Sequence, residues 1–212
     1  MKSIHFNFID KVFEMGDLPN LGKEELKNFI KHRVNTKMGD LGLEPIIPSE
    51  EIDKGALKTM IRARELDIPV VLDADLSNGE NKEDLIRNSS HVLFSKPALD
   101  DYFQGMSVED SLKCAREINN GWVGVTDGSN GTYWLEDNKL RNFPVFKVNT
   151  MDTLGAGDVF HGVFALYLAE GKSEEKSIIF ASAAASIYCA RTNGRDSIPN
   201  REEINNFIKT NK

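Results

Sequence analysis

Residues Val148–Gly162, with the sequence VNTMDTLGAGDVFHG, decide the fold of the chain. Phe146 and Val148 alternate with polar residues, which predicts the end of a strand. Gly155 and Gly157 follow, at positions where a tight turn needs residues without a Cβ atom and where backbone can approach a ligand closely. The stretch therefore predicts a strand that leads through a glycine turn into the next element.

That next element is a helix with an acidic first turn. Apolar side chains recur at helical spacing from Ala156 to Glu170, and Gly171 then favours the end of the helix. A helix that begins on a glycine turn presents unpaired N–H groups and the positive end of its dipole, which together favour an anion. Asp158 in this turn places a carboxylate beside the place where charge develops in phosphoryl transfer. The same pattern also occurs as a plain helix cap, so the residues alone leave both interpretations open.

The segment Asp152–Asp158, DTLGAGD, resembles the C-terminal signature of the PfkB (ribokinase-like) carbohydrate kinases. The resemblance implies that Asp158 deprotonates the substrate hydroxyl and also contacts the substrate. It implies ATP and Mg²⁺ as cofactors, and a monovalent-cation site, with K⁺ as its ion, shaped by Asp152 and Thr153. The backbone amides that would hold the transferring phosphate are those of Gly155, Ala156 and Gly157.

A second motif, Val125–Gly131 with the sequence VTDGSNG, resembles the loop of the same family that passes along ATP. As a lone Asp-Gly turn it would more often be a hairpin. The nucleotide-binding residues that the resemblance implies here are Thr126, Gly128, Ser129, Asn130 and Gly131. A later helix, predicted over 174–191, is rich in small residues, which favour either close helix packing or room for a purine. In the family this helix lines the adenine pocket, which implies Ala185 and Ser186 as neighbours of the base.

Helices and buried strands alternate from residue 50 to the end, which predicts an α/β fold with a doubly wound, mainly parallel sheet and flanking helices. A buried strand over 68–72 runs into Asp73 and Asp75, whose alternative role is capping and solvation. Ligands are expected at the carboxyl ends of such strands, where Asp73, Ser95, Asp127 and Gly155 fall. Ser95–Ala98 replaces the Asn-x-x-Glu motif of many family members. In this departure the chain resembles the ketohexokinase-like branch, which puts a magnesium role for these side chains in doubt. The ending Asn193–Pro199 most nearly resembles the branch that acts on sulfofructose and related ketoses.

The first 49 residues resemble a compressed version of a much longer substrate-binding half. Asp10 matches an early Asp that contacts sugar hydroxyls in the family, and a solvated Asp at a strand end is the alternative. A Gly-Gly segment and the strands of a lid are not recognisable. We therefore expect one ribokinase-like domain over 1–212, with a substrate and lid part over 1–49 and a nucleotide-binding and catalytic core over 50–212. Either the lid is reduced or missing, or the sequence is an incomplete rendering of a longer protein.

The composition is that of an ordinary globular protein, with 40% hydrophobic and 28% charged residues. A formal net charge of −7 argues against nucleic acid and anionic membrane surfaces as partners. Cys114 and Cys189 lack metal-ligand partners at short spacing, which favours buried thiols in a reducing, cytoplasmic setting. The expected partner is a small sugar or a sugar-like substrate. A homodimer is an assembly that the resemblance raises, and the oligomeric state stays open.

Two functions of different classes follow. The first is an ATP-dependent kinase that phosphorylates a hydroxyl of a sugar or sugar-like substrate, with Asp158 as the base. The second is a catalytically impaired, nucleotide-binding remnant or regulatory module, motivated by the absent Gly-Gly segment. A dinucleotide-dependent enzyme is disfavoured because no Gly-x-Gly-x-x-Gly follows the first predicted strand.

Overall fold

A computed structural model describes residues 49–75 and 82–211. Asp10 and the other predictions for residues 1–48 lie outside these residues. The strands are β1 (Val71–Ala74), β2 (His91–Ser95), β3 (Trp122–Thr126), β4 (Thr132–Glu136) and β5 (Lys139–Phe143). The helices are α3 (Ser49–Glu65), α4 (Lys82–Asn88), α5 (Lys96–Tyr102), α6 (Val108–Asn119), α7 (Ala156–Ala169), α8 (Glu174–Cys189) and α9 (Arg201–Thr210), with 3₁₀ turns at Gly128–Asn130 and Gly194–Ser197.

The five strands form one sheet in the order β1-β2-β3-β4-β5. Neighbouring strands from β1 to β3 are parallel, and β4 and β5 add an antiparallel meander to the edge. Connections through α4 and α6 join the parallel strands, as a βαβ unit requires. The expected α/β fold with a sheet and flanking helices is confirmed, and the sheet is mixed.

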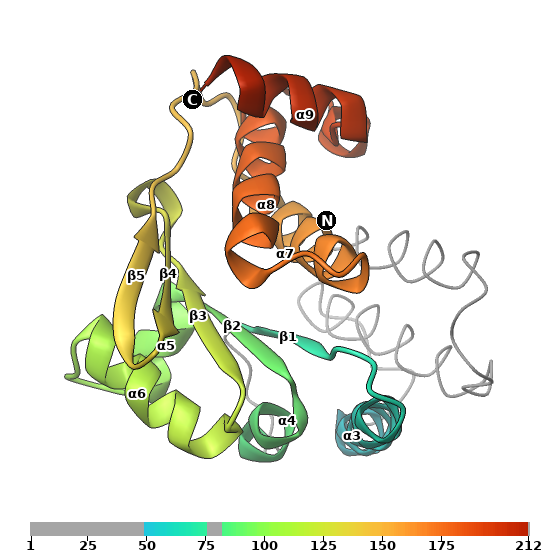
Figure 1. Cartoon of the computed structure of the whole chain (residues 1–212), viewed down its shortest axis with the longest axis vertical. Coiled ribbons are helices and arrows are strands. Elements are labelled where there is room, and N and C mark those ends of the chain that lie inside the picture. The colour runs from blue at the N-terminus through green and yellow to red at the C-terminus, as the bar shows by residue number, and fades with distance from the viewer. Residues whose placement is uncertain (1–48, 76–81, 212) are drawn as a thin grey trace.

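Helices cover both faces of this sheet (Figure 1). On β2, Val92 and Phe94 point into one cluster, together with residues of α4, α5 and α6. Leu93 points to the opposite face and packs against Phe160 and Phe164 of α7 and Ile178 of α8. Because successive strand residues face opposite sides, a continuous apolar run such as Val92-Leu93-Phe94 is what a strand buried on both faces needs.

The helix α7 begins and ends at the two predicted glycines. Gly155 is its N-cap residue, and Gly171 beyond its end has a φ of +75°. The N–H of Gly171 donates to the carbonyl of Leu168 at 2.9 Å, and the N–H of Lys172 donates to that of Tyr167 at 3.0 Å. These two bonds form a Schellman motif, which satisfies carbonyls that the helix leaves unpaired.

Two predicted strand boundaries were wrong. The segment with Phe146 and Val148 is in no strand, because β5 ends at Phe143. Its partner β4 starts opposite, at Thr132, and Pro144 has no N–H to continue the ladder. The first described strand covers 71–74 and so includes Asp73, whereas the sequence predicted 68–72. Within the described ranges, no helix is long and apolar enough to cross a membrane.

Candidate active site

Of the two glycines that the sequence predicts in the turn before α7, Gly155 has turn geometry and Gly157 does not. Gly155 has a φ of +89°, a left-handed conformation that side chains disfavour. Gly157 has an ordinary helical backbone, and a Cβ built on it would meet no atom within 4 Å. Folding therefore does not require glycine at position 157, and the missing side chain leaves open space in front of the backbone. In the part of the chain that the structure describes, no hydrogen bond uses the N–H of Gly157.

The last turn of α8 supports this glycine turn from behind. The hydroxyl of Tyr188 donates to the carbonyl of Leu154 at 2.7 Å. A Cβ on Gly155 would lie 3.1 Å from the same hydroxyl oxygen. Burial raises the pKa of Tyr188, and the charges of Asp152, Cys189 and Asp158 raise this pKa further. Tyr188 therefore stays protonated and remains a donor.

The segment ahead of the turn is tied to the same helix end. The backbone N–H groups of Met151 and Asp152 both donate to the carbonyl of Cys189, at 2.7 and 3.2 Å. The carboxylate of Asp152 accepts from the N–H of Leu154 at 2.9 Å, which closes an Asx turn. Thr153, the other residue predicted for a monovalent cation, is exposed, and its carbonyl accepts from Ala156 at 3.1 Å.

Asp158 lies in the first turn of α7 and is half-buried. One of its carboxylate oxygens is 3.9 Å from the position that a Cβ on Gly155 would take. The carboxylate therefore folds back toward the glycine turn. A candidate base and the N-terminus of α7 therefore lie next to each other.

His161, one helical turn further along α7, connects the Gly155–Asp158 turn to the sheet. Its Nε2 is 3.5 Å from a carboxylate oxygen of Asp73 on β1 and 3.4 Å from the carbonyl oxygen of Leu93 on β2. Asp73 is next to the last residue of β1, and Leu93 is the middle residue of β2. The Gly155–Asp158 turn therefore stands at the edge of the sheet where α/β proteins bind ligands.

The predicted nucleotide loop follows β3 at this carboxyl edge. The carbonyl of Gly131 accepts from the N–H of Asp127 at 2.8 Å, and the side-chain amide of Asn130 donates to the Asp127 carboxylate at 3.0 Å. A Cβ on Gly131 would lie 2.2 Å from the carbonyl oxygen of Phe143, so only glycine fits there. Gly128, Ser129 and Asn130 are exposed, and the hydroxyl of Thr126 donates to the carbonyl of Phe94 at 3.4 Å.

Two residues of the segment Ser95–Ala98, which replaces the Asn-x-x-Glu motif, have clear structural duties. Ser95 caps α5 by accepting from Ala98, and its hydroxyl donates to the Asp75 carboxylate at 2.9 Å. Lys96 contacts both carboxylate oxygens of Asp100, one turn along α5, at 2.6 and 2.5 Å. The Lys96 ammonium is therefore paired within its own helix.

The two predicted base neighbours lie on α8 close to Tyr188. Ala185 is half-buried and packs against the cluster around Phe160. Ser186 is only 2% exposed, and within the described ranges its hydroxyl has no hydrogen-bond partner. Of the two, Ala185 therefore offers the more accessible surface.

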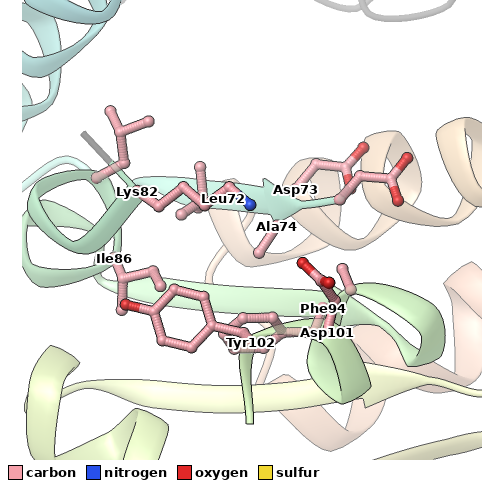
Figure 2. Close-up of a pocket in the computed structure, with 11 residues that line it drawn as sticks. Leu72, Asp73, Ala74, Lys82, Ile86, Phe94, Asp101 and Tyr102 are labelled. Carbon is pink, nitrogen blue, oxygen red and sulfur yellow. The ribbon is translucent and has the colours of Figure 1, made fainter. Parts of the chain in front are cut away.

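A pocket opens beside the carboxyl end of β1, on the face of the sheet opposite α7 (Figure 2). Leu72 and Ala74 of β1 lie over Phe94 and Tyr102, and Lys82 lies toward one end. Of the predicted site residues, the pocket includes only strand-end acids of β1, and neither the Gly155 turn nor the loop after β3 lines it. The turn before α7, rather than this pocket, combines backbone amides with a carboxylate at one place.

The acidic residues of the described part form no cluster of three or more metal-ligating side chains.

Two residues of the site were missed by the sequence analysis. Tyr188 is separated from Leu154 by 34 positions, so only the fold reveals the contact. His161 could have been noticed as a polar side chain among the apolar residues of α7, with only 5% of it exposed.

Comparisons with known proteins identify the family of the chain. The model of the pfkB family carbohydrate kinases matches residues 33–201. A ribokinase from Bacillus subtilis (strain 168) is 26% identical over 162 residues, which cover 76% of this chain and 52% of the relative. The crystal structure of a Thermotoga maritima ribokinase matches with a TM-score of 0.63 and 30% identity, covering 73% of this chain and 54% of that one. An Arabidopsis thaliana ribokinase complexed with ribose and ATP matches with a TM-score of 0.64 and 25% identity, over 74% of this chain and 53% of that one.

The chain spans about half the length of these relatives. The family model nevertheless covers most of the chain, including both the loop after β3 and the turn before α7. The chain therefore belongs to the pfkB family of carbohydrate kinases.

Proposed function

We propose that the protein transfers the γ-phosphoryl group of ATP to a hydroxyl of a sugar or sugar-like substrate at the N-terminus of α7. The observation that carries the proposal is the Gly155–Asp158 turn at the carboxyl edge of the sheet, with a carboxylate folded back toward open backbone N–H groups. A helix N-terminus favours the phosphate, and the carboxylate favours the neighbouring hydroxyl.

In this mechanism Asp158 is the base. Its carboxylate accepts the proton of the sugar hydroxyl while the sugar oxygen attacks the γ-phosphorus. The bond from that phosphorus to the bridging oxygen breaks, and ADP leaves with the electron pair. The amides of Gly155, Ala156 and Gly157 are the proposed donors to the charge that develops on the phosphoryl oxygens. Of these, the N–H of Ala156 also donates to the carbonyl of Thr153 at 3.1 Å, so the N–H of Gly157 is the main donor. Mg²⁺ bound with the nucleotide neutralises part of the phosphate charge.

The nucleotide lies between the loop after β3 and the end of α8. Exposed Gly128, Ser129 and Asn130 follow the phosphates and the ribose, and Ala185 contacts the base. Asp152 and Thr153 are the residues proposed for K⁺, and the Asx turn of Asp152 holds their backbone in place. The proposal treats the chain as one ribokinase-like unit with its core in 50–212. A homodimer stays a prediction, and the molecular mass measured by light scattering tests it.

The substrate is proposed as a class. The relatives named ribokinase make ribose the first sugar to test. The resemblance of Ser95–Ala98 to the ketohexokinase-like branch makes ketoses such as fructose the second. Asp10, proposed to contact the sugar, lies outside the described residues.

The first experiment measures sugar-dependent release of ADP by the wild-type protein and by Asp158→Asn. A general base contributes a factor of about 100 to 10,000, so the variant is expected to lose activity by that factor. Asp110→Asn is the matched control, because Asp110 also lies in the first turn of a helix, three residues after the N-cap Ser107. We expect Asp110→Asn to keep the wild-type rate. Wild-type turnover by Asp158→Asn would remove Asp158 as the base.

A second candidate function is a nucleotide-binding module without turnover. Its motivation is that a Gly-Gly substrate segment and the strands of a lid are not recognisable in the sequence. Calorimetric titration with ATP, paired with the same panel of sugars, separates the two functions. Binding of ATP without turnover on any sugar favours the module, and sugar-dependent turnover removes it.

A further inference from the structure

We propose that His161 is a positioning residue for the phosphoryl-transfer turn, and that it acts as a doubly protonated imidazolium paired with Asp73. Its effect on turnover rests on the proposed function. Its protonation state does not, and is tested separately.

The ring of His161 bridges the three elements that meet at the site. Its Nδ1 is 2.7 Å from the carbonyl oxygen of Gly157, inside the turn itself. Its Nε2 is 3.4 Å from the carbonyl oxygen of Leu93 and 3.5 Å from the carboxylate of Asp73. The side chains of His161 and Asp73 are 5% and 16% exposed, so water competes little for these contacts.

The partners decide the protonation of the ring. Carbonyl and carboxylate oxygens accept hydrogen bonds and donate none. A neutral imidazole carries one N–H, so one of its nitrogens would direct a lone pair at oxygen atoms. A proton on both nitrogens satisfies every contact, and the carboxylate of Asp73 balances the resulting buried charge. From β2 and α7 the ring meets backbone carbonyls, and from β1 it meets the charged Asp73.

The bridge holds the turn in register with the sheet. The bond to the Gly157 carbonyl fixes the peptide between Gly157 and Asp158, and the contacts to β1 and β2 fix the ring. A shift of this peptide moves the Asp158 carboxylate and the turn amides together. Misplacement by about 1 Å can cost about 100-fold in rate, so a side chain that only aligns the turn can still govern turnover.

Nuclear magnetic resonance of the ¹⁵N-labelled full chain tests the protonation directly. At neutral pH we expect the two ring nitrogens of His161 to give the matching shifts of an imidazolium, assigned by their loss in His161→Asn. His91 is the internal comparison, because its Nε2 also lies 3.5 Å from a carboxylate, that of Glu174. Its Nδ1, however, lies 2.8 Å from the Ser90 hydroxyl, which can donate or accept. In Asp73→Asn, the new amide can donate to Nε2, and His161 is expected to show the split shifts of a neutral ring. Split shifts for His161 in the wild-type protein would overturn the charged pair.

Variants test the positioning role. His161→Phe removes the contact to Gly157, and we expect kcat to fall about 10-fold to 100-fold with little change in the KM for ATP. His161→Asn is expected to lose less than His161→Phe but more than nothing, because it keeps the contact to Gly157 and loses the contacts to β1 and β2. Its amide can still reach the carbonyl four residues back, as Asn88 and Asn211 do in α4 and after α9, at 2.8 and 2.9 Å.

Equal kcat for folded His161→Phe and wild type would overturn the positioning role. If His161→Phe does not fold, a loss of kcat of about 10-fold to 100-fold in folded His161→Asn would overturn the role of the Gly157 contact. Should the wild-type protein phosphorylate no sugar, the proposed function fails and the nuclear magnetic resonance result still decides the charge on His161.

Discussion

Replacing Gly155 by alanine is expected to lower the free energy of unfolding by about 2 kcal/mol. A non-glycine residue in the left-handed region costs roughly 1–2 kcal/mol, and Gly155 has a φ of +89°. The new Cβ would also lie 3.1 Å from the Tyr188 hydroxyl. That hydroxyl cannot retreat without weakening its bond to the carbonyl of Leu154, and such a bond is worth about 1 kcal/mol. The lower entropy of the unfolded alanine chain offsets roughly 0.4–1 kcal/mol of this loss.

Urea unfolding of matched variants separates the two contributions. Gly171 has a similar φ of +75°, and a Cβ there would meet no atom within 4 Å. Gly171→Ala therefore measures backbone strain alone and is expected to cost about 1 kcal/mol. Tyr188→Phe removes the crowding oxygen, so Gly155→Ala should cost less in that background. If Gly155→Ala is no more destabilising than Gly171→Ala, and Tyr188→Phe leaves its cost unchanged, the assigned contact with Tyr188 is wrong.

Three further changes probe the turn, a buried histidine and a helix cap. Gly157→Ala should raise the free energy of unfolding by about 0.5–1 kcal/mol, because the position is helical and open. The same substitution should lower the rate of phosphoryl transfer, because the new methyl group meets the substrate. Unchanged turnover would count against the proposed phosphate position. Burial lowers the pKa of His91 more strongly than Glu174 raises it, so the neutral ring is the form that the folded state favours. The stability that His91 contributes is therefore fully present above the ordinary pKa of about 6.5, and it is lost as the pH falls through the lower pKa of the folded state. Urea unfolding at several pH values should show a smaller loss of stability in His91→Gln than in the wild-type protein. Asn200→Ala removes the capping box of α9 and should cost about 1 kcal/mol by thermal unfolding, and a cost near zero would mean that the cap adds nothing.

The elements with strong local signals could be predicted from the sequence. The helix α7 has a glycine at each end and apolar residues at helical spacing, and its bounds agree with the prediction to within one residue. The run Val92-Leu93-Phe94 of β2 is apolar at every position because both sheet faces are covered. Strand ends were less predictable, because the end of β5 depends on its pairing with β4 and on Pro144.

The candidate site divides in the same way. The turn at Gly155 has a local signature, since the left-handed conformation needs glycine. The supports of this turn do not, because Tyr188 and Asp73 reach it from remote parts of the chain. Which distant side chains meet at a sheet edge is decided by how the helices pack on the sheet, and one sequence does not contain that information in any local pattern.

The most direct test of the account is the structure of the full chain with a non-hydrolysable ATP analogue and Mg²⁺. We expect a terminal phosphate oxygen within hydrogen-bonding distance, about 2.7–3.2 Å, of the Gly157 N–H, with the base beside Ala185. A nucleotide seated in the pocket between β1 and α5, on the opposite face of the sheet, would contradict the assignment of phosphoryl transfer to the turn before α7.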